Sequence, residues 1–274
     1  MTSAQMVSVV TFLYLFCTVL FFLYLAFRSE RLGKIASGIA WFSLILHSAA
    51  ILWRWRESYQ IGAGHAPLSN MYESLVFFSW CIAVIYLLLE WRLKIRVLGA
   101  LVMPFAFIFI GYASLAPGVS ARIDPLVPAL QSNWLHAHVI TCFLGYASFA
   151  ISCGISVVYL LKFGKKAKEQ PEGSLLAFFP SLDFLDTLVY KTILVGFPLL
   201  TIGIITGAAW ANYAWGAYWS WDPKETWSLI TWFVYAVFLH ELSCPHNSRL
   251  PLTVRIVRKP RILVECAFDL LDHC

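Results

Sequence analysis

"MVSVVTFLYLFCTVLFFLYLAF", residues 6–27, contains no charged side chain and decides the fold of this chain. At about 1.5 Å per residue, a helix of this length crosses the roughly 30 Å hydrocarbon core of a bilayer. The whole 274-residue sequence is also strongly apolar, with 60% hydrophobic and 13% charged residues. This composition is too apolar for a water-soluble domain of this size, so it predicts an integral membrane protein.

Seven windows are apolar enough to cross a bilayer, and they predict an all-α, polytopic membrane helix bundle with about seven transmembrane helices. The first ten residues carry no Lys or Arg, and no small-residue cleavage site follows, so we expect the first window to be retained and not removed as a signal peptide. We expect one bundle over residues 1–245 and a short basic tail over 246–274. The windows are residues 6–27, 35–53, 71–91, 97–115, 134–161, 187–210 and 226–243.

Basic side chains mark the loops expected in the cytoplasm, because Lys and Arg are retained there. The loops after the first, third and fifth windows are basic, and the other loops are poorer in Lys and Arg. The predicted topology therefore has the N-terminus outside and the C-terminus inside. It accounts for the net charge of +5 without a nucleic-acid partner. The basic residues of the odd-numbered loops are Arg28, Arg31, Lys34, Arg92, Lys94, Arg96, Lys162, Lys165, Lys166 and Lys168.

The seven cysteines form no CxxC pair and no metal-ligand spacing. Four of them, Cys17, Cys81, Cys142 and Cys153, lie inside apolar windows, where a thiol behaves as a small hydrophobe. We expect structural roles for these four. The sequence also contains no Gly-rich phosphate loop and no internal repeat.

A second stretch, "WGAYWSWDPKETW" at residues 215–227, places four tryptophans among thirteen residues on the predicted outer face. Asp222, Pro223 and Glu225 match a helix start, with an N-cap acceptor, a proline in the first turn and an acid at the third position. An aromatic belt at the membrane interface needs only one or two rings per helix end. The stretch therefore either forms such a belt or holds a large planar ligand against its aromatic faces.

The string "WGAYWSWDPKE" resembles the tryptophan-rich WWD signature of the haem-handling membrane proteins of cytochrome c assembly, in their CcsA/ResC branch. Four further stretches resemble this family and cover most of the chain. They are "GHAPLSNMYESLVFFSW" at 64–80, "NWLHAHV" at 133–139, "GFPLLTIGIITGAAWAN" at 196–212 and "TWSLITWFVYAVFLH" at 226–240.

The resemblance implies a function in cytochrome c biogenesis. Haem b would be carried to the outer face, held by a WWD loop at 210–227, and presented to the CxxCH motif of an apocytochrome c. It also implies a CcsB/ResB-type membrane partner, with which the chain would form a cytochrome c synthase, or haem lyase. The lipid bilayer would be the bacterial inner membrane, or the thylakoid membrane in a plastid.

Two histidines are the expected ligands of haem iron, since neutral imidazole is the usual axial ligand. His138 matches the family histidine that ligates the outer haem. His136 lies about 200° around the same helix and cannot serve the same iron. His240 lies about 27 Å from Asp222 along the same predicted helix. The resemblance assigns it to a second, membrane-embedded haem site. The alternative is a histidine that snorkels at the inner membrane surface. The other cofactor-binding residues expected at the outer face are Trp210, Trp215, Trp219, Trp221 and Asp222.

Other polar residues are open to both a ligand-binding and a structural interpretation. His47, inside the second window, is either a ligand or a hydrogen-bonding partner of a neighbouring helix. His65 precedes Asn70 and Glu73, which look like a capping box. The basic side chains expected outside would meet haem propionates or anchor the chain at the interface. They are Arg54, Arg56, Arg122 and Lys224.

The sequence after His240 departs from the family pattern, which continues into a further apolar span with a second outer histidine. Its longest apolar piece, "ILVECAF" at 262–268, is too short to cross a bilayer. We expect His246 and His273 to be cytoplasmic, which leaves the outer haem at most one ligand from this chain. The alternative function is therefore a membrane haem-binding or regulatory protein of HemX type without synthase activity.

Overall fold

The computed structural model describes residues 2–166 and 175–243. The tail predicted at 246–274 lies outside these residues. Every regular element in the described ranges is helical, which confirms the predicted all-α membrane bundle. The α-helices are α1 (Ser3–Phe27), α2 (Glu30–Gln60), α3 (Met71–Leu93), α4 (Gly99–Leu115), α5 (Asn133–Lys166), α6 (Leu182–Trp215) and α7 (Pro223–Ser243), and the short 3-10 helices are η1 (Arg96–Leu98), η2 (Pro128–Leu130) and η3 (Leu175–Phe178).

Six helical segments of the described chain are long and apolar enough to cross a membrane, namely α1, α2, α3, η1 with α4, α5 and α6. The seventh predicted window forms α7, which is helical but is not among these six. Several helices are longer than their windows; α2, for example, begins at Glu30 and ends at Gln60. The hydropathy windows mark only the hydrocarbon-facing part of a helix, because polar residues extend it into the interface.

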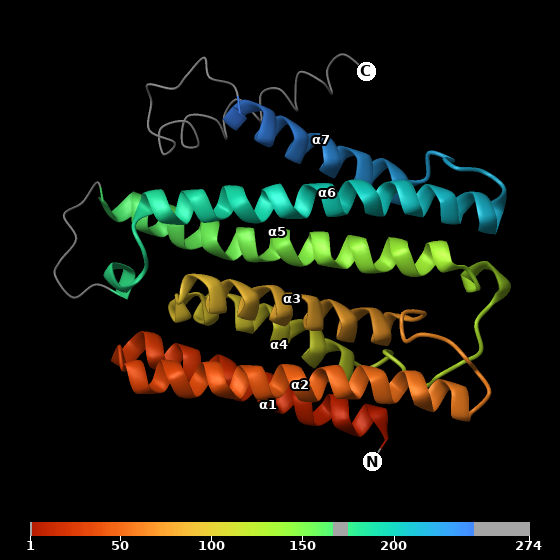
Figure 1. The fold of residues 1–274 in the computed structure, drawn as a ribbon, viewed down its shortest axis with the longest axis horizontal. Helices are drawn as coiled ribbons and strands as arrows, with labels where there is room; N and C mark the ends of the chain where they lie inside the picture. The colour runs from red at the N-terminus through yellow and green to blue at the C-terminus, as the bar shows by residue number, and fades with distance from the viewer. Residues whose placement is uncertain (1, 167–174, 244–274) are drawn as a thin grey trace.

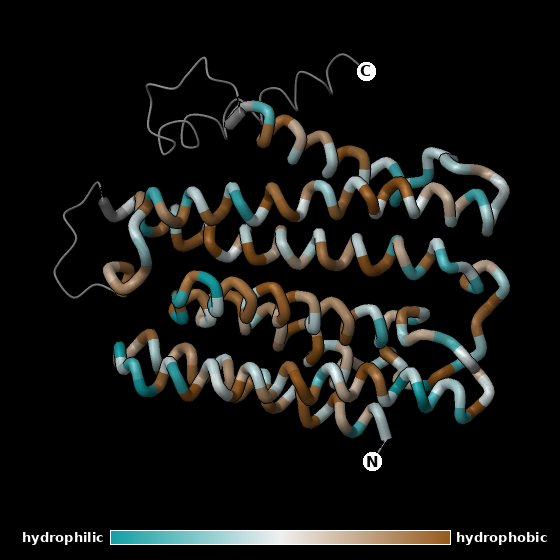
Figure 2. Tube along the Cα trace, viewed as in Figure 1, coloured by the Kyte–Doolittle hydropathy of each residue, from teal (hydrophilic) through white to brown (hydrophobic). Residues whose placement is uncertain are grey.

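The helices lie side by side along the long dimension of the molecule (Figure 1), with α1 packed on α2 and α4, α3 on α4 and α5, and α6 on α5 and α7. The N-terminus and the α2–α3, α4–α5 and α6–α7 connections lie at one end (Figure 1). Apolar residues follow the middle of the bundle, and hydrophilic ones gather toward its ends (Figure 2). The charge pattern predicts that the end with the N-terminus faces outward, and the orientation remains a prediction.

Small residues bring α5 and α6 close together. A Cβ atom at Gly203 of α6 would lie 2.5 Å from the Sγ atom of Cys142, and one at Gly196 would lie 2.7 Å from the Phe149 ring. On α5, a Cβ atom at Gly145 would lie 3.2 Å from the carbonyl oxygen of Gly196. Glycine at such positions lets two membrane helices approach closely. This close packing sets the distance between α5 and α6 at the end of the bundle where α6 leads into α7.

Candidate functional site

The tryptophan-rich turn between α6 and α7 is held by a capping box. Asp222 Oδ1 accepts the N–H of Glu225 at 2.7 Å, and Glu225 Oε2 accepts the N–H of Asp222 at 3.4 Å and that of Ser220 at 2.7 Å. This confirms the helix start predicted at Asp222–Glu225. Before it, α6 ends at Gly216 with a φ of 78°, and Trp221 has a φ of 60°. A left-handed tryptophan costs on the order of 1–3 kcal/mol, so the surrounding turn must hold Trp221 in place.

A cavity of about 230 Å³ lies beneath this turn, between α5, α6 and the start of α7. We call it the outer cavity, after the face on which the charge pattern predicts it. Five of the seven predicted site residues line it. His138 comes from α5, Trp210 and Trp215 come from α6, and Trp219 and Asp222 come from the turn.

The remaining two predicted site residues lie elsewhere. Trp221 does not line the outer cavity and is 71% exposed. His240 is exposed near the other end of α7, so it shares no site with His138. Its expected role at an inner haem site remains a prediction.

A hydrogen bond to a backbone carbonyl orients the ring of His138. Its Nδ1 atom lies 2.7 Å from the carbonyl oxygen of Gly203, with the Sγ atom of Cys142 at 3.6 Å from the same nitrogen. A carbonyl oxygen only accepts, so Nδ1–H donates and Nε2 keeps its lone pair in the neutral ring. A Cβ atom at Gly207 would lie 2.6 Å from Nδ1, so this glycine leaves the space that the ring occupies. An imidazole oriented through Nδ1 is the form that binds a metal through Nε2.

The indole rings form the walls of the outer cavity. Trp210 lies nearly parallel to the His138 ring, with centroids 6.0 Å apart, and its Nε1 donates to the carbonyl oxygen of Ala129 at 2.8 Å. Trp215 meets Trp210 edge to face at 4.9 Å. The Nε1 of Trp219 is buried and, among the residues that the structure describes, has no hydrogen-bond partner. Buried N–H groups are normally bonded, so this donor fits a ligand with an acceptor at its edge.

The side chains that line the outer cavity suit a metal that is already coordinated by a macrocycle, and not a bare metal ion. Within residues 2–166 and 175–243, no group of three or more His, Cys, Asp or Glu side chains could hold a bare metal ion. A single imidazole between aromatic walls suits the iron of a macrocycle. The cavity is smaller than the roughly 300–1,000 Å³ of common cofactor sites, so in this conformation it receives part of a large ring and does not enclose it.

The positions of His136, His47 and His65 differ from that of His138. His136 lines another cavity on the opposite side of α5, as the predicted rotation requires. His47 is fully buried, and its Nδ1 lies 3.1 Å from the hydroxyl of Tyr14 on α1, which supports the interpretation as a partner of a neighbouring helix. Both ring nitrogens of His65 face carbonyl oxygens, those of Ala66 at 2.9 Å and Asp124 at 3.0 Å. His65 therefore joins two loops.

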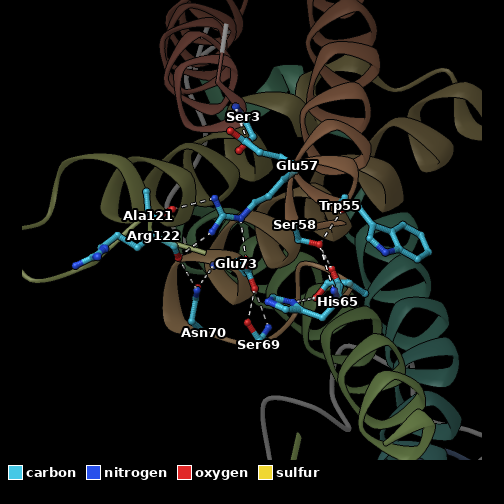
Figure 3. A network of polar contacts seen from close by, with 12 residues as sticks. Ser3, Trp55, Glu57, Ser58, His65, Ser69, Asn70, Glu73, Ala121 and Arg122 are labelled. Atoms are coloured by element: carbon cyan, nitrogen blue, oxygen red, sulfur yellow. Dashed lines mark hydrogen bonds and ion pairs between the residues drawn. The ribbon is translucent and has the colours of Figure 1, made fainter. Parts of the chain in front are cut away.

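Arg54 is not available to meet a ligand carboxylate. Its side chain is 3% exposed, its Nε donates to Glu73 Oε1 at 2.8 Å, and its terminal nitrogens donate to the carbonyls of Ala121 and Arg122. The predicted capping box at Asn70 and Glu73 forms only in part, because the Glu73 carboxylate accepts from Arg54 and from Ser69. Figure 3 shows the Glu73 carboxylate turned toward Ser69. Of the four basic residues expected at the outer face, Lys224 lines the outer cavity.

Two further residues of the site, Gly203 and Gly207, are not among those predicted from the sequence. One supplies the carbonyl that orients His138, and the other leaves room for its ring. Their spacing in "GIITG", residues 203–207, is the small-residue pattern of close helix packing, and it could have identified them.

Known proteins resemble this chain in sequence and in fold. The Cytochrome C assembly protein family matches residues 68–251. A cytochrome c biogenesis protein CcsA from Chlamydomonas reinhardtii is 42% identical over 217 residues, which are 78% of this chain and 58% of that protein. The CcsA of Guillardia theta is 43% identical over 202 residues, 68% of this chain and 65% of the relative. The CcsA of Mesostigma viride is 40% identical over 219 residues, 73% and 70% of the two chains.

A solved structure, "Cytochrome c Heme Lyase CcmF", superposes with a TM-score of 0.63 at 17% identity, over 88% of this chain and 42% of that one. It shares the fold. The matched part of our chain spans less than two thirds of the first two CcsA relatives. With a family match over most of its length and about 40% identity to CcsA proteins, the chain belongs to the cytochrome C assembly protein family, in its CcsA branch.

Proposed function

We propose that this chain holds haem b at the outer face of the membrane and presents it for attachment to apocytochrome c. The observation that carries the proposal is His138, whose Nδ1 is bonded to a carbonyl and whose ring lines a cavity walled by Trp210, Trp215 and Trp219. The unpartnered Nε1 of Trp219 supports it. The family and the names of its relatives agree with this role.

Haem, when bound, supplies the vinyl groups that form thioether bonds with the cysteines of CxxCH. The residues of this chain bind and orient it. His138 would ligate the iron, and the three tryptophans would pack against the ring. Lys224, at the cavity wall, would meet a propionate. Asp222 would act indirectly, since its carboxylate holds the start of α7.

The rest of the proposal concerns haem entry and partners. His240, near the other end of α7, would ligate haem taken up inside the membrane, with the opposite ligand from a CcsB/ResB-type subunit. Residues 1–245 would form one transmembrane bundle with the WWD loop, residues 210–227, on its outer face. The membrane would be the bacterial inner membrane, or the thylakoid membrane in a plastid.

Co-expression distinguishes this function from that of a HemX-type binding protein. The chain is expressed with a CcsB-type partner and an apocytochrome c, and covalent haem is detected by in-gel haem stain. Covalent haem that depends on this chain and is lost in His138→Ala supports a role in the synthase. Non-covalent haem in the purified chain without any haem-stained cytochrome would support the HemX-type alternative. A chain that binds no haem, alone or with its partner, would contradict both.

A further inference from the structure

A second cavity lies on the other side of α5 from the outer cavity, and we call it the lateral cavity. Its volume is about 1150 Å³, above the roughly 300–1,000 Å³ of common cofactor sites. Its walls come from α2, α3, the start of α5 and the loops that precede α3 and α5. It therefore has room for a ligand that the outer cavity accommodates only in part.

The walls of the lateral cavity are aromatic and uncharged. Trp55 and Tyr59 come from α2, and Phe77 and Trp80 come from α3, where their rings stack at 5.6 Å with an angle of 18°. Trp80 is held in place because its Nε1 donates to Ser48 Oγ at 2.8 Å. None of the residues that line this cavity is Lys, Arg, Asp or Glu. The walls thus suit the flat apolar face of a ligand, and the polar side chains that they offer, such as Gln131 and Asn133, are neutral.

His136 supplies the one imidazole with open nitrogens in this wall. Its ring is half-buried and, within the described part of the chain, makes no hydrogen bond. The other histidine in the wall, His65, has both nitrogens at carbonyl oxygens. An imidazole that opens into a large aromatic cavity is a ligand for the iron of a tetrapyrrole.

We propose that the lateral cavity is a second haem-binding chamber at the same end of the bundle, with His136 as its axial ligand. The inference rests on the proposed function, since it assumes that haem reaches this end of the chain. His136 and His138 leave α5 about 200° apart, so one helix carries an imidazole toward each cavity. Haem bound through His136 is a separate population from haem bound through His138.

Titration of the purified full chain with ferric haem in detergent tests this proposal by absorption spectroscopy and stoichiometry. In these tests the His138→Ala chain also carries His240→Ala, which removes both ligands of the proposed function, and it should keep a haem with the spectrum of an imidazole-ligated iron. Adding His136→Ala to that variant should weaken the remaining binding by about tenfold or more, and added imidazole should restore its spectrum. Trp134→Ala is the matched control, because this exposed residue of α5 lines neither cavity.

A variant that fills the cavity keeps the test independent of the histidine. Ala63→Trp, in the cavity wall, should reduce binding in the His138→Ala chain with His136 intact, and imidazole should not restore it. Metal-free protoporphyrin should be excluded by Ala63→Trp but not by His136→Ala, because it packs without a ligand bond. The elution volume in gel filtration checks that each variant is folded.

The outcomes separate the two proposals. If His138→Ala alone abolishes all haem binding, the lateral chamber is overturned and the outer site stands. If binding to the His138→Ala chain is unaffected by His136→Ala and by Ala63→Trp, the lateral chamber is also overturned. If the wild-type chain and its complex bind no haem, the proposed function fails as well.

Discussion

A single backbone carbonyl determines which nitrogen His138 offers to a ligand. The Gly203 oxygen binds Nδ1–H, so Nε2 is left as the basic nitrogen. His138→Ala should therefore lower haem occupancy or shift the absorption spectrum of the outer site, and added imidazole should restore part of it, because a free ring can enter the vacated position. His136→Ala should leave the spectrum of haem bound through His138 unchanged. A wild-type spectrum in His138→Ala without imidazole would contradict this assignment.

The indole N–H of Trp219 is a second polar group whose role in ligand binding can be tested. Its buried Nε1 is unpartnered in the described structure, and such a donor costs stability until a ligand bonds it. Trp219→Phe keeps an aromatic ring and removes the donor. The melting temperature of the haem-free chain should stay the same or rise, while haem affinity should fall by about 0.5–1.5 kcal/mol, the net value of one hydrogen bond. A lower melting temperature with unchanged affinity would show that the N–H has no ligand.

At the scale of the element, the α2–α3 connection depends on a buried ion pair. Arg54 and Glu73 have side chains 3% and 0% exposed, and Arg54 also binds two carbonyls of the α4–α5 loop. Glu73→Gln leaves a buried cation without its counter-charge, which costs about 3–5 kcal/mol. The melting temperature in detergent should fall clearly, while Arg56→Ala, an exposed neighbour, should change stability by less than about 0.5 kcal/mol. Equal melting temperatures for the two variants would contradict the role of this pair.

The packing of α6 on α5 sets the space for the His138 ring. Gly207→Ala places a Cβ atom 2.6 Å from Nδ1, closer than atoms can approach, so the ring must move. Haem occupancy of the outer site should fall toward that of His138→Ala. Gly38→Ala on α2 is the control, since its Cβ atom would meet no atom within 4 Å. Unchanged haem binding in Gly207→Ala would mean that the ring position matters less than the geometry indicates.

The sequence predicts features that depend on local periodicity. Apolar windows identify the helices, and the rotation between His136 and His138 follows from helix geometry. The aromatic turn and its capping box follow from neighbouring residues. Pairings between distant segments do not follow, because Arg54 meets Glu73, and His138 meets Gly203, only after the helices pack. The lateral cavity is likewise a product of three helices and two loops, and no single stretch indicates it.

At the scale of the whole molecule, the two cavities face the outer side of the membrane only if the bundle has the orientation that its charge pattern predicts. The α2–α3, α4–α5 and α6–α7 connections share one end with the N-terminus, and the α1–α2 and α3–α4 connections, whose basic residues include Arg28 and Lys94, lie at the other end (Figure 1). A reporter that is active only outside the cytoplasm should be active when fused after Ser120 or within residues 213–218, and silent after Lys166 or at Cys274. A silent fusion after Ser120 together with an active one after Lys166 would invert the bundle and move His138 to the cytoplasmic face. Activity at Cys274 alone would instead indicate an eighth crossing, which would change the expected position of the tail and leave both cavities where the charge pattern predicts them.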